Sequence, residues 1–383
     1  MPTSPLRPTE LELSGTRITA TYRVAGDEPR VHDVVEQLVV EQTIEFPREL
    51  VPDDDISRHL IGRVEATRPV GDALTDAQIS FAVELAGGQL PQLINVLFGN
   101  ISMVPGVRLV DIGLPPALLD SFCGPQLGLP GLRRLLESPT APLLATALKP
   151  IGTPIDRLAD MAYELAVNGV QLVKDDHSFA TQPFASFRER VPMLAKAVKR
   201  AGEQRGAPSI YLPALNLPTQ ELAAGVEFAL ESGAGGLLAL PGIHGHDTMR
   251  WLADSTPADI VIMAHPSLLG SHVVAPDHGI APELVFGTFA RLAGADVSIF
   301  PNHSGRFSFS EETCRDIART CAAPLGSLAA TVAAPAGGMN VPRIPEMLAF
   351  YGTDVCLLIG GDLYRGDIAT QVQRTARAIR ESI

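Results

Sequence analysis

The residues best suited to chemistry form the segment Lys174-Asp175-Asp176-His177, which directly follows the apolar run Gly169–Val173. Ionisable side chains at the end of a buried run are costly, because a buried charge needs a partner or a bound cation. Side chains alternate along an extended segment, so we expect Lys174 and Asp176 to share a face and Asp175 to point away. Such a lysine could act as a base or nucleophile, or its free amine could add CO₂ and become an anionic metal ligand. The plainer alternative is a solvated cluster of salt bridges.

Other polar or glycine-rich positions also follow apolar runs, directly or a few residues later. They are Lys149, His265, Arg306, Gly337-Gly338 and Gly360-Gly361. One Gly-Gly pair alone is most often a turn, but two pairs at corresponding positions favour a phosphate site, because backbone N–H groups in such loops can bind an anion. His265 taken alone fits a core histidine as well as a functional one.

The elements that must position these residues lie in the second part of the chain. Eight apolar runs there alternate with amphipathic segments: Leu143–Leu148, Val170–Val173, Ser209–Leu215, Gly236–Leu240, Ile260–Ala264, Asp296–Phe300, Ala329–Ala334 and Val355–Ile359. Buried parallel strands read as continuous apolar runs, and a (β/α)₈ TIM barrel requires eight of them. Reactive groups of that fold lie at the carboxyl ends of the strands. We therefore predict an α/β barrel with its site at that end.

The first part of the chain contains strands and helices without a repeating unit, which predicts a small α+β domain. The expected strands are Thr16–Val24, Gly62–Val70, Ala77–Leu85 and Val107–Leu114, and the expected helices are Val31–Glu41 and Pro91–Phe98. The turn-rich segment Cys123–Gly131 separates the two parts. We place the N-terminal domain at residues 1–130 and the barrel domain at residues 131–383.

Composition narrows the classes of function. The 383 residues include 43 acidic and 30 basic side chains, and the net charge of −13 argues against binding to nucleic acid or to an anionic membrane. The four cysteines form no CxxC pair, so neither a thiolate zinc site nor a disulfide scaffold is indicated. Neither a secretion signal nor an apolar run of transmembrane length is evident. We expect a cytoplasmic protein with a small-molecule partner.

The segment Asn168–Arg190, NGVQLVKDDHSFATQPFASFRER, resembles the metal-site segment of ribulose bisphosphate carboxylase (RuBisCO). In that family, a GGxDFxKDDE strand end continues into QPF and a helix with an arginine. Further matches follow the family's order: FGN at 98–100, FxGP at 122–125, TALKP at 146–150, HG at 278–279, GR at 305–306, AGG at 336–338 and IGG at 359–361. The resemblance covers nearly the whole chain and implies a TIM barrel preceded by a small ferredoxin-like α+β domain.

The resemblance also implies a metal site, with one departure. In RuBisCO the lysine of this segment is carbamylated and binds Mg²⁺ with the second aspartate and a glutamate; the corresponding residues here are Lys174, Asp176 and His177. Mg²⁺ prefers oxygen ligands, so His177 admits Mn²⁺, another divalent cation or no metal in its place.

Further departures concern the substrate. The arginine expected after His265 is Pro266, and the histidine expected at the end of the sixth strand is Ile299. These two changes remove one of the family's two phosphate sites. The other site is retained at the glycines of the last two strand ends, Gly337, Gly338, Gly360 and Gly361. The substrate is therefore expected to carry one phosphate. In addition, the second lysine of the first-strand motif is Ile151, and the lysine of the mobile loop is Arg306.

This pattern resembles RuBisCO-like proteins (form IV), which do not fix CO₂, and implies an enolate formed from a singly phosphorylated keto-sugar or 3-oxo sugar acid. The implied catalytic residues are Lys149, which would move protons at carbon, Arg306, which would hold a substrate carboxylate, Lys174 and His265. We favour a decarboxylase, for example of 3-oxo-isoapionate 4-phosphate. The alternative is an enolase or isomerase of a methylthio-sugar phosphate in methionine salvage. A catalytically silent sugar-phosphate binder and a Schiff-base aldolase are two further possibilities.

The resemblance finally implies an assembly. The family's active site is shared between subunits, so Glu41 and Asn100 of the N-terminal domain would bind substrate in a neighbour's barrel. We expect a homodimer or a higher homo-oligomer built from dimers.

Overall fold

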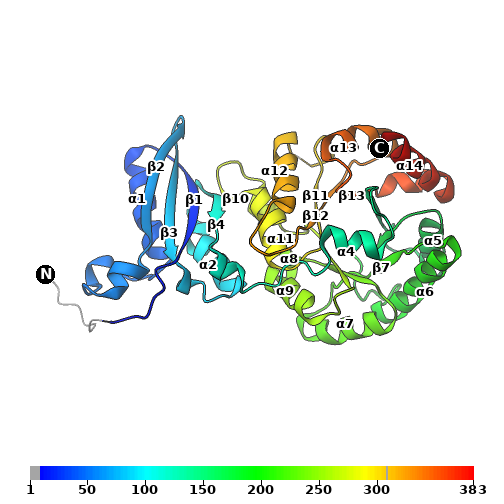
Figure 1. The fold of residues 1–383 in the computed structure, drawn as a ribbon, viewed down its shortest axis with the longest axis horizontal. Helices are drawn as coiled ribbons and strands as arrows, with labels where there is room; N and C mark the ends of the chain where they lie inside the picture. The colour runs from blue at the N-terminus through cyan, green and yellow to red at the C-terminus, as the bar shows by residue number, and fades with distance from the viewer. Residues whose placement is uncertain (1–8, 308) are drawn as a thin grey trace. The chain divides into compact units, whose positions relative to one another are not determined.

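A computed structural model describes residues 9–307 and 309–383 (Figure 1). Contacts divide the chain into two compact units. Unit 1 comprises Met1–Phe122 and Leu269–Val285, and unit 2 comprises Cys123–Leu268 and Phe286–Ile383. The segment Leu269–Val285 belongs to unit 1 and contains a short strand, Gly279–Ile280, that pairs with the sheet of that unit.

Unit 1 is built on a sheet with the strand order β10-β4-β1-β3-β2. Its strands are β1 (Arg17–Ala25), β2 (Arg63–Gly71), β3 (Leu74–Ala82), β4 (Val107–Gly113) and the short β10 (Gly279–Ile280). The first four pair antiparallel, and β10 adds in parallel to β4. Helices α1 (Glu28–Glu41) and α2 (Leu90–Phe98) complete a βαββαβ order, and the short α3 (Pro116–Leu119) and α10 (Gly270–Val273) also belong to this unit. The ferredoxin-like N-terminal fold is confirmed.

Alternation and capping explain these elements. Every second residue of β1 is buried, and α1 buries Val31, Val34, Val35, Leu38 and Val39 at helical spacing against β1, β2 and β3. Asp27 caps α1 by accepting a hydrogen bond from the Arg30 backbone N–H. Strand β3 begins at Leu74 rather than at the expected Ala77, because the hairpin with β2 pairs the ladder back to that residue.

Unit 2 contains the eight predicted barrel strands. They are β5 (Leu143–Ala147), β6 (Leu172–Lys174), β7 (Ile210–Leu212), β8 (Gly236–Ala239), β9 (Val261–Ala264), β11 (Val297–Pro301), β12 (Val332–Ala336) and β13 (Cys356–Leu358). They form two parallel sheets, β13-β5-β6-β7 and β12-β11-β9-β8. Parallel bridges between Ala214 and Leu238 and between Ala333 and Val355 join the two sheets at both edges. The eight strands therefore close into a ring, and the predicted TIM barrel is confirmed.

Helices surround this ring (Figure 1). They are α5 (Ile155–Val167), α6 (Phe187–Arg205), α7 (Leu222–Glu231), α8 (Pro241–His244), α9 (His246–Ser255), a π-helical turn Leu284–Phe289 that continues into α11 (Ala290–Leu292), α12 (Glu311–Ala322), α13 (Ile344–Tyr351) and α14 (Ile368–Ser382). Helix α6 begins at Phe187, because Ser186 caps it by accepting from the Glu189 backbone N–H. Phe184 therefore precedes the helix.

The barrel interior is filled with side chains. Apolar residues from all eight strands, among them Leu143, Leu172, Met263 and Ile299, form one buried core. Helix α4 (Gly128–Leu135) adds Leu132 to this core. Asp296, which directly precedes β11, accepts hydrogen bonds from the Leu127 and Gly128 N–H groups and so holds the start of α4 against the barrel. The barrel is thus a packed scaffold rather than a pore, and polar chemistry is left to the loops at its ends.

In the described part of the chain, no helix combines the length and the apolar character needed to cross a membrane. The four cysteines are free; Cys314, Cys321 and Cys356 are buried as expected for core residues, whereas Cys123 is exposed.

Candidate active site

Lys149, Asp176 and His177 meet at the carboxyl end of the barrel. Strands β5 and β6 pair in parallel with Ala147 opposite Lys174, so the residues that follow them lie side by side. The Lys149 ammonium donates a hydrogen bond to Asp176 Oδ2, and His177 Nδ1 lies 2.7 Å from Asp176 Oδ1. The Ser178 N–H and hydroxyl also donate to Oδ1, at 3.2 and 3.1 Å. One nearly buried carboxylate therefore holds both basic groups.

Asp175 points away from this pocket, as the alternation predicts. It is fully buried, and its Oδ2 lies 3.1 Å from Arg190 Nη2 of α6. The Tyr211 hydroxyl donates to Oδ1 at 2.8 Å, and the Ala214 N–H donates to Oδ2 at 3.1 Å. Asp175 thus fastens the end of β6 to α6 and β7. Our sequence analysis missed Tyr211, although alternation along β7 indicates that it points outward between the core residues Ile210 and Leu212.

Lys174 is buried with its ammonium 3.0 Å from the Asp175 carbonyl oxygen, to which it donates. Burial, followed by the positive charge of Lys149, lowers the pKa of Lys174 to about 7. A substantial fraction of the amine is therefore neutral near pH 7 and can react with CO₂ or take a proton. Because Lys174, Asp175 and Asp176 are all buried, the alternative of a solvated salt-bridge cluster is wrong.

His177 and His265 stack with their ring centroids 4.4 Å apart and their planes 13° apart. Burial is the main cause that lowers the pKa of both rings, and the charges of Lys174 and Lys149 lower each pKa further. His265 Nδ1 accepts from the Ser267 N–H at 3.2 Å, so the proton of the neutral ring lies on Nε2. His265 consequently offers a neutral N–H donor to a ligand.

Arg306 adds positive charge to the pocket. It follows β11, its guanidinium lies 5.0 Å from the centre of the Phe307 ring, and its charge lowers the pKa of both Lys149 and His177. For Lys149, burial is the larger cause. Three basic side chains thus act together around the single carboxylate of Asp176. This excess of positive charge favours an anionic ligand even though the whole protein is acidic.

The two glycine pairs occupy the loops after β12 and β13, as expected. Gly337 and Gly338 have positive φ angles of 82° and 83°, which favour glycine. A Cβ built on Gly360 or Gly361 meets no atom within 4 Å, so a ligand could approach the backbone there closely. Asp362 Oδ2 accepts from the Val341 N–H at 3.0 Å and joins the two loops. This arrangement is suited to a phosphate.

Glu41 and Asn100 lie in unit 1, at the end of α1 and at the start of the 3₁₀ turn Asn100–Met103. The buried Gln42 side chain fastens these two ends. Its Nε2 donates to the Asn95 and Val96 carbonyl oxygens at 2.9 Å, and its Oε1 accepts from the Ile101 N–H at 2.9 Å. Our sequence analysis did not single out Gln42.

Two departures named in the sequence analysis, Ile151 and Ile299, and two further histidines have other surroundings. Ile299 is part of the barrel core, and Ile151 is exposed in the loop after β5. The Nε2–H group of His244, at the end of α8, donates to the Leu217 carbonyl oxygen at 3.0 Å. His303 is buried against Phe350.

A divalent cation fits this pocket only under one condition. Within residues 9–307 and 309–383, no group of three His, Cys, Asp or Glu side chains converges, and Lys174 as an amine contributes no anionic oxygen. Carbamylation of Lys174 would replace a cation with an anionic oxygen donor next to Asp176 and His177. The donor set therefore fits a cation when Lys174 is carbamylated.

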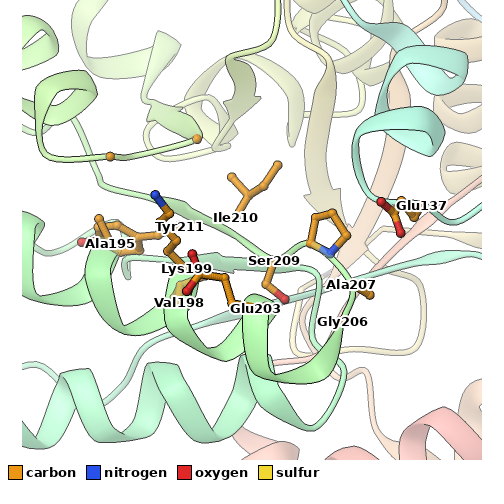
Figure 2. A pocket seen from close by; sticks show the side chains of 14 residues that line it. Glu137, Ala195, Val198, Lys199, Glu203, Gly206, Ala207, Ser209, Ile210 and Tyr211 are labelled. Carbon is orange, nitrogen blue, oxygen red and sulfur yellow. The ribbon is translucent and has the colours of Figure 1, made fainter.

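A cavity of about 380 Å³ lies at the opposite end of the barrel (Figure 2). Lys199 and Glu203 of α6 line it together with Glu137 and the loop that precedes β7. These residues lie at the amino ends of the strands, whereas the basic cluster lies at the carboxyl ends. The cavity is therefore separate from the candidate active site.

The lowered pKa of Lys174 predicts a stability effect that depends on pH. Its folded-state pKa of about 7 lies below its ordinary value of 10.5, so the buried charge penalises the fold fully below pH 7, and the penalty disappears as the pH rises toward 10.5. We expect Lys174→Met to raise the free energy of unfolding by about 5 kcal/mol at pH 6 but only about 2 kcal/mol at pH 9.

Urea unfolding in bicarbonate-free buffer measures this difference. Lys196→Met, at an exposed position of α6, is the matched control and should change stability little at either pH. An equal gain for Lys174→Met at both pH values would show that Lys174 is not titrating as a buried amine.

Comparison with known proteins identifies the family of this chain. Residues 128–383 match the family model described as ribulose bisphosphate carboxylase large chain, catalytic domain. Ribulose bisphosphate carboxylase-like protein 1 from Rhodopseudomonas palustris is 39% identical over 95% of this chain and 96% of its own length. A 5-methylthioribulose-1-phosphate isomerase from Rhodospirillum rubrum is 39% identical over 91% of each chain.

Solved structures share the fold. A Rubisco-like protein from Rhodopseudomonas palustris superposes with a TM-score of 0.85 at 34% identity, covering 95% of this chain and 98% of its own. A dimeric archaeal Rubisco from Hyperthermus butylicus superposes with a TM-score of 0.86 at 23% identity, covering 99% of this chain and 92% of its own. With its retained lysines, aspartate and glycine loops, and with relatives of this kind along nearly its whole length, the chain belongs to the ribulose bisphosphate carboxylase large-chain family and is a RuBisCO-like protein.

Proposed function

We propose that this protein is an enolate-forming isomerase or enolase of a singly phosphorylated keto-sugar, with 5-methylthioribulose 1-phosphate as the first substrate to test. The similarity to the Rhodospirillum rubrum isomerase supports this reaction over the decarboxylation that we favoured from the sequence. The observation that carries the proposal is the basic cluster of Lys149, Lys174 and Arg306 beside the neutral His265, with Asp176 paired to Lys149.

Lys149 is the proposed acid and base. Burial and the charge of Arg306 lower its pKa, which increases the fraction of neutral amine at physiological pH. The neutral amine takes a proton from the carbon next to the carbonyl, and the electron pair of the broken C–H bond forms the enolate. The resulting ammonium, hydrogen-bonded to Asp176, then returns the proton to a carbon of the enolate.

The other residues bind and orient the substrate. The Nε2–H group of His265 donates to the substrate carbonyl oxygen, where negative charge develops. The glycine loops after β12 and β13 bind the phosphate, and Arg306 covers the site. Mg²⁺ or Mn²⁺ bound by carbamylated Lys174, Asp176 and His177 would polarise the carbonyl and stabilise the enolate oxygen.

An apolar rim supports a thioether substrate over a sugar acid. Four large apolar side chains in loops at the carboxyl ends of β5, β6, β9 and β11 are exposed: Ile151, Phe184, Leu268 and Phe307. They add exposed apolar surface to the end of the barrel that carries the basic cluster. The methylthio group of a thioether substrate gains apolar contact with such a rim. The carboxylate of a sugar acid would lose hydration there.

Replacing Lys149 tests the proton-transfer role. We expect Lys149→Met to lower kcat about 10³-fold on 5-methylthioribulose 1-phosphate, because removing a positioned acid–base group typically costs a factor of this order. The measurement is turnover followed by ¹H and ³¹P NMR. Lys196→Met is the matched control and should retain the wild-type rate, and near-normal turnover by Lys149→Met would refute the role.

Mixing two inactive variants tests the shared site. We propose that Glu41 and Asn100 contact substrate in the barrel of a neighbouring subunit, as the family resemblance implies. Asn100→Ala and Lys149→Met should each be inactive alone. After denaturation and refolding together, half of the dimers should be mixed and carry one intact site, so about a quarter of wild-type activity returns.

Native mass spectrometry of the refolded mixture reports whether mixed dimers form. Mixed dimers without recovered activity would contradict the shared site, and so would a monomer as the only active species.

A further inference from the structure

Two loops at the active end of the barrel are joined at their bases by one buried side chain. Asn302 directly follows β11 and is 1% exposed. Its backbone N–H donates to the Ala336 carbonyl oxygen at the end of β12, at 2.8 Å. Its side-chain Nδ2 lies 3.3 Å from the sulfur of Met339, which directly follows Gly338. Asn302 therefore links the start of the loop after β11, which carries Arg306, to the loop after β12, which carries Gly337 and Gly338. These are called the Arg306 loop and the glycine loop.

The Asn302 amide has a fixed orientation. The Tyr351 hydroxyl, at the end of α13, donates to Asn302 Oδ1 at 2.6 Å. The Nδ2 group must then face the sulfur atoms of Met339 and Met347, at 3.3 and 3.1 Å. Thioether sulfur is a weak acceptor, so this buried amide is poorly compensated for its lost hydration. An apolar side chain at position 302 would fill this space without the cost of burying a poorly paired amide. We infer that the Asn302 amide has a role other than packing.

The same two loops touch again near their tips. A Cβ built on Gly338 would lie 2.8 Å from the Gly305 Cα atom, and one built on Gly305 would collide with the Gly337 carbonyl oxygen. Gly305 directly precedes Arg306. The contact at the tips and the Asn302 contact at the bases leave little freedom for one loop to move without the other.

We propose that Asn302, held by Tyr351, is a positioning residue that couples phosphate binding at Gly337-Gly338 to the placement of Arg306. The inference rests on the proposed function, in which those glycines bind the phosphate of the substrate. Phosphate fixes the backbone of the glycine loop, and Asn302 and Gly305 transfer this restraint to Arg306. A ligand without a phosphate would then meet a pocket that lacks a fixed arginine, which makes the phosphate a requirement for closure as well as for affinity.

Trypsin cleavage after Arg306 reports the coupling without any need for turnover, because this arginine is exposed. The probe is inorganic phosphate, and its binding is measured separately by calorimetry. In the wild type, saturating phosphate should slow cleavage after Arg306 about fivefold or more. In Tyr351→Phe and Asn302→Leu, phosphate should bind within about threefold of the wild-type affinity yet slow cleavage less than about twofold.

Two controls make the result specific. Tyr163→Phe removes a tyrosine hydroxyl that bonds to Gln204 on the outer helices and should behave as the wild type. A free arginine peptide shows whether phosphate acts on trypsin itself. A variant that merely weakened the fold would lose phosphate affinity and would be cleaved faster in both conditions, whereas the expected variant changes only the response to phosphate.

The contradicting outcomes are distinct. Equal protection by phosphate in the wild type and in both variants would overturn the coupling and leave the phosphate site standing. The same holds if phosphate binds the wild type but gives no protection. Failure of phosphate to bind the wild-type protein would instead refute the glycine site and, with it, the proposed function.

Discussion

The buried ion pair of Asp175 with Arg190 is the interaction on which the candidate site depends. Both side chains are fully buried, and Tyr211 and Ala214 occupy the remaining carboxylate positions. Lys174 and Asp176 flank Asp175 at the end of β6. Without the ion pair, either Asp175 or these two neighbours could face the solvent. Because Asp175 is fastened outward to α6 and β7, alternation directs Lys174 and Asp176 into the pocket. Breaking this pair would leave an uncompensated charge in the core.

Electrostatics in the pocket follow from this placement. The charges of Lys149 and Lys174 act on both histidines, the charge of Arg306 acts on Lys149 and His177, and the Asp176 carboxylate bonds to Lys149 and His177. Burial is the larger cause that lowers the pKa of both lysines, and the charge of Arg306 for Lys149 and of Lys149 for Lys174 lowers each pKa further. Both shifts increase the fraction of neutral amine. An anionic ligand relieves the repulsion, so substrate binding and amine reactivity have the same physical origin.

The sequence predicts the barrel well because each strand is a short apolar run, and polar or glycine residues follow most of these runs directly or a few residues later. The same pattern places Lys149, Lys174 and the glycine pairs correctly. It does not find Tyr211, Asn302 or Tyr351, because their roles depend on partners distant in sequence, such as Asp175 for Tyr211 and Met339 for Asn302. Nor does it find β10, since two residues that pair with β4 carry no periodic signal. The outward direction of Asp175 was predictable, but its partner in the ion pair was not.

The most direct test of the account is hydrogen exchange on 5-methylthioribulose 1-phosphate in D₂O, followed by ¹H NMR with the wild-type enzyme. Enolate formation at the basic cluster predicts that a hydrogen on the carbon next to the carbonyl is replaced by deuterium while the phosphate stays on the sugar. If the compound binds, as shown by calorimetry, and no carbon-bound hydrogen exchanges or shifts, the cluster does not form an enolate from it and the central claim is wrong.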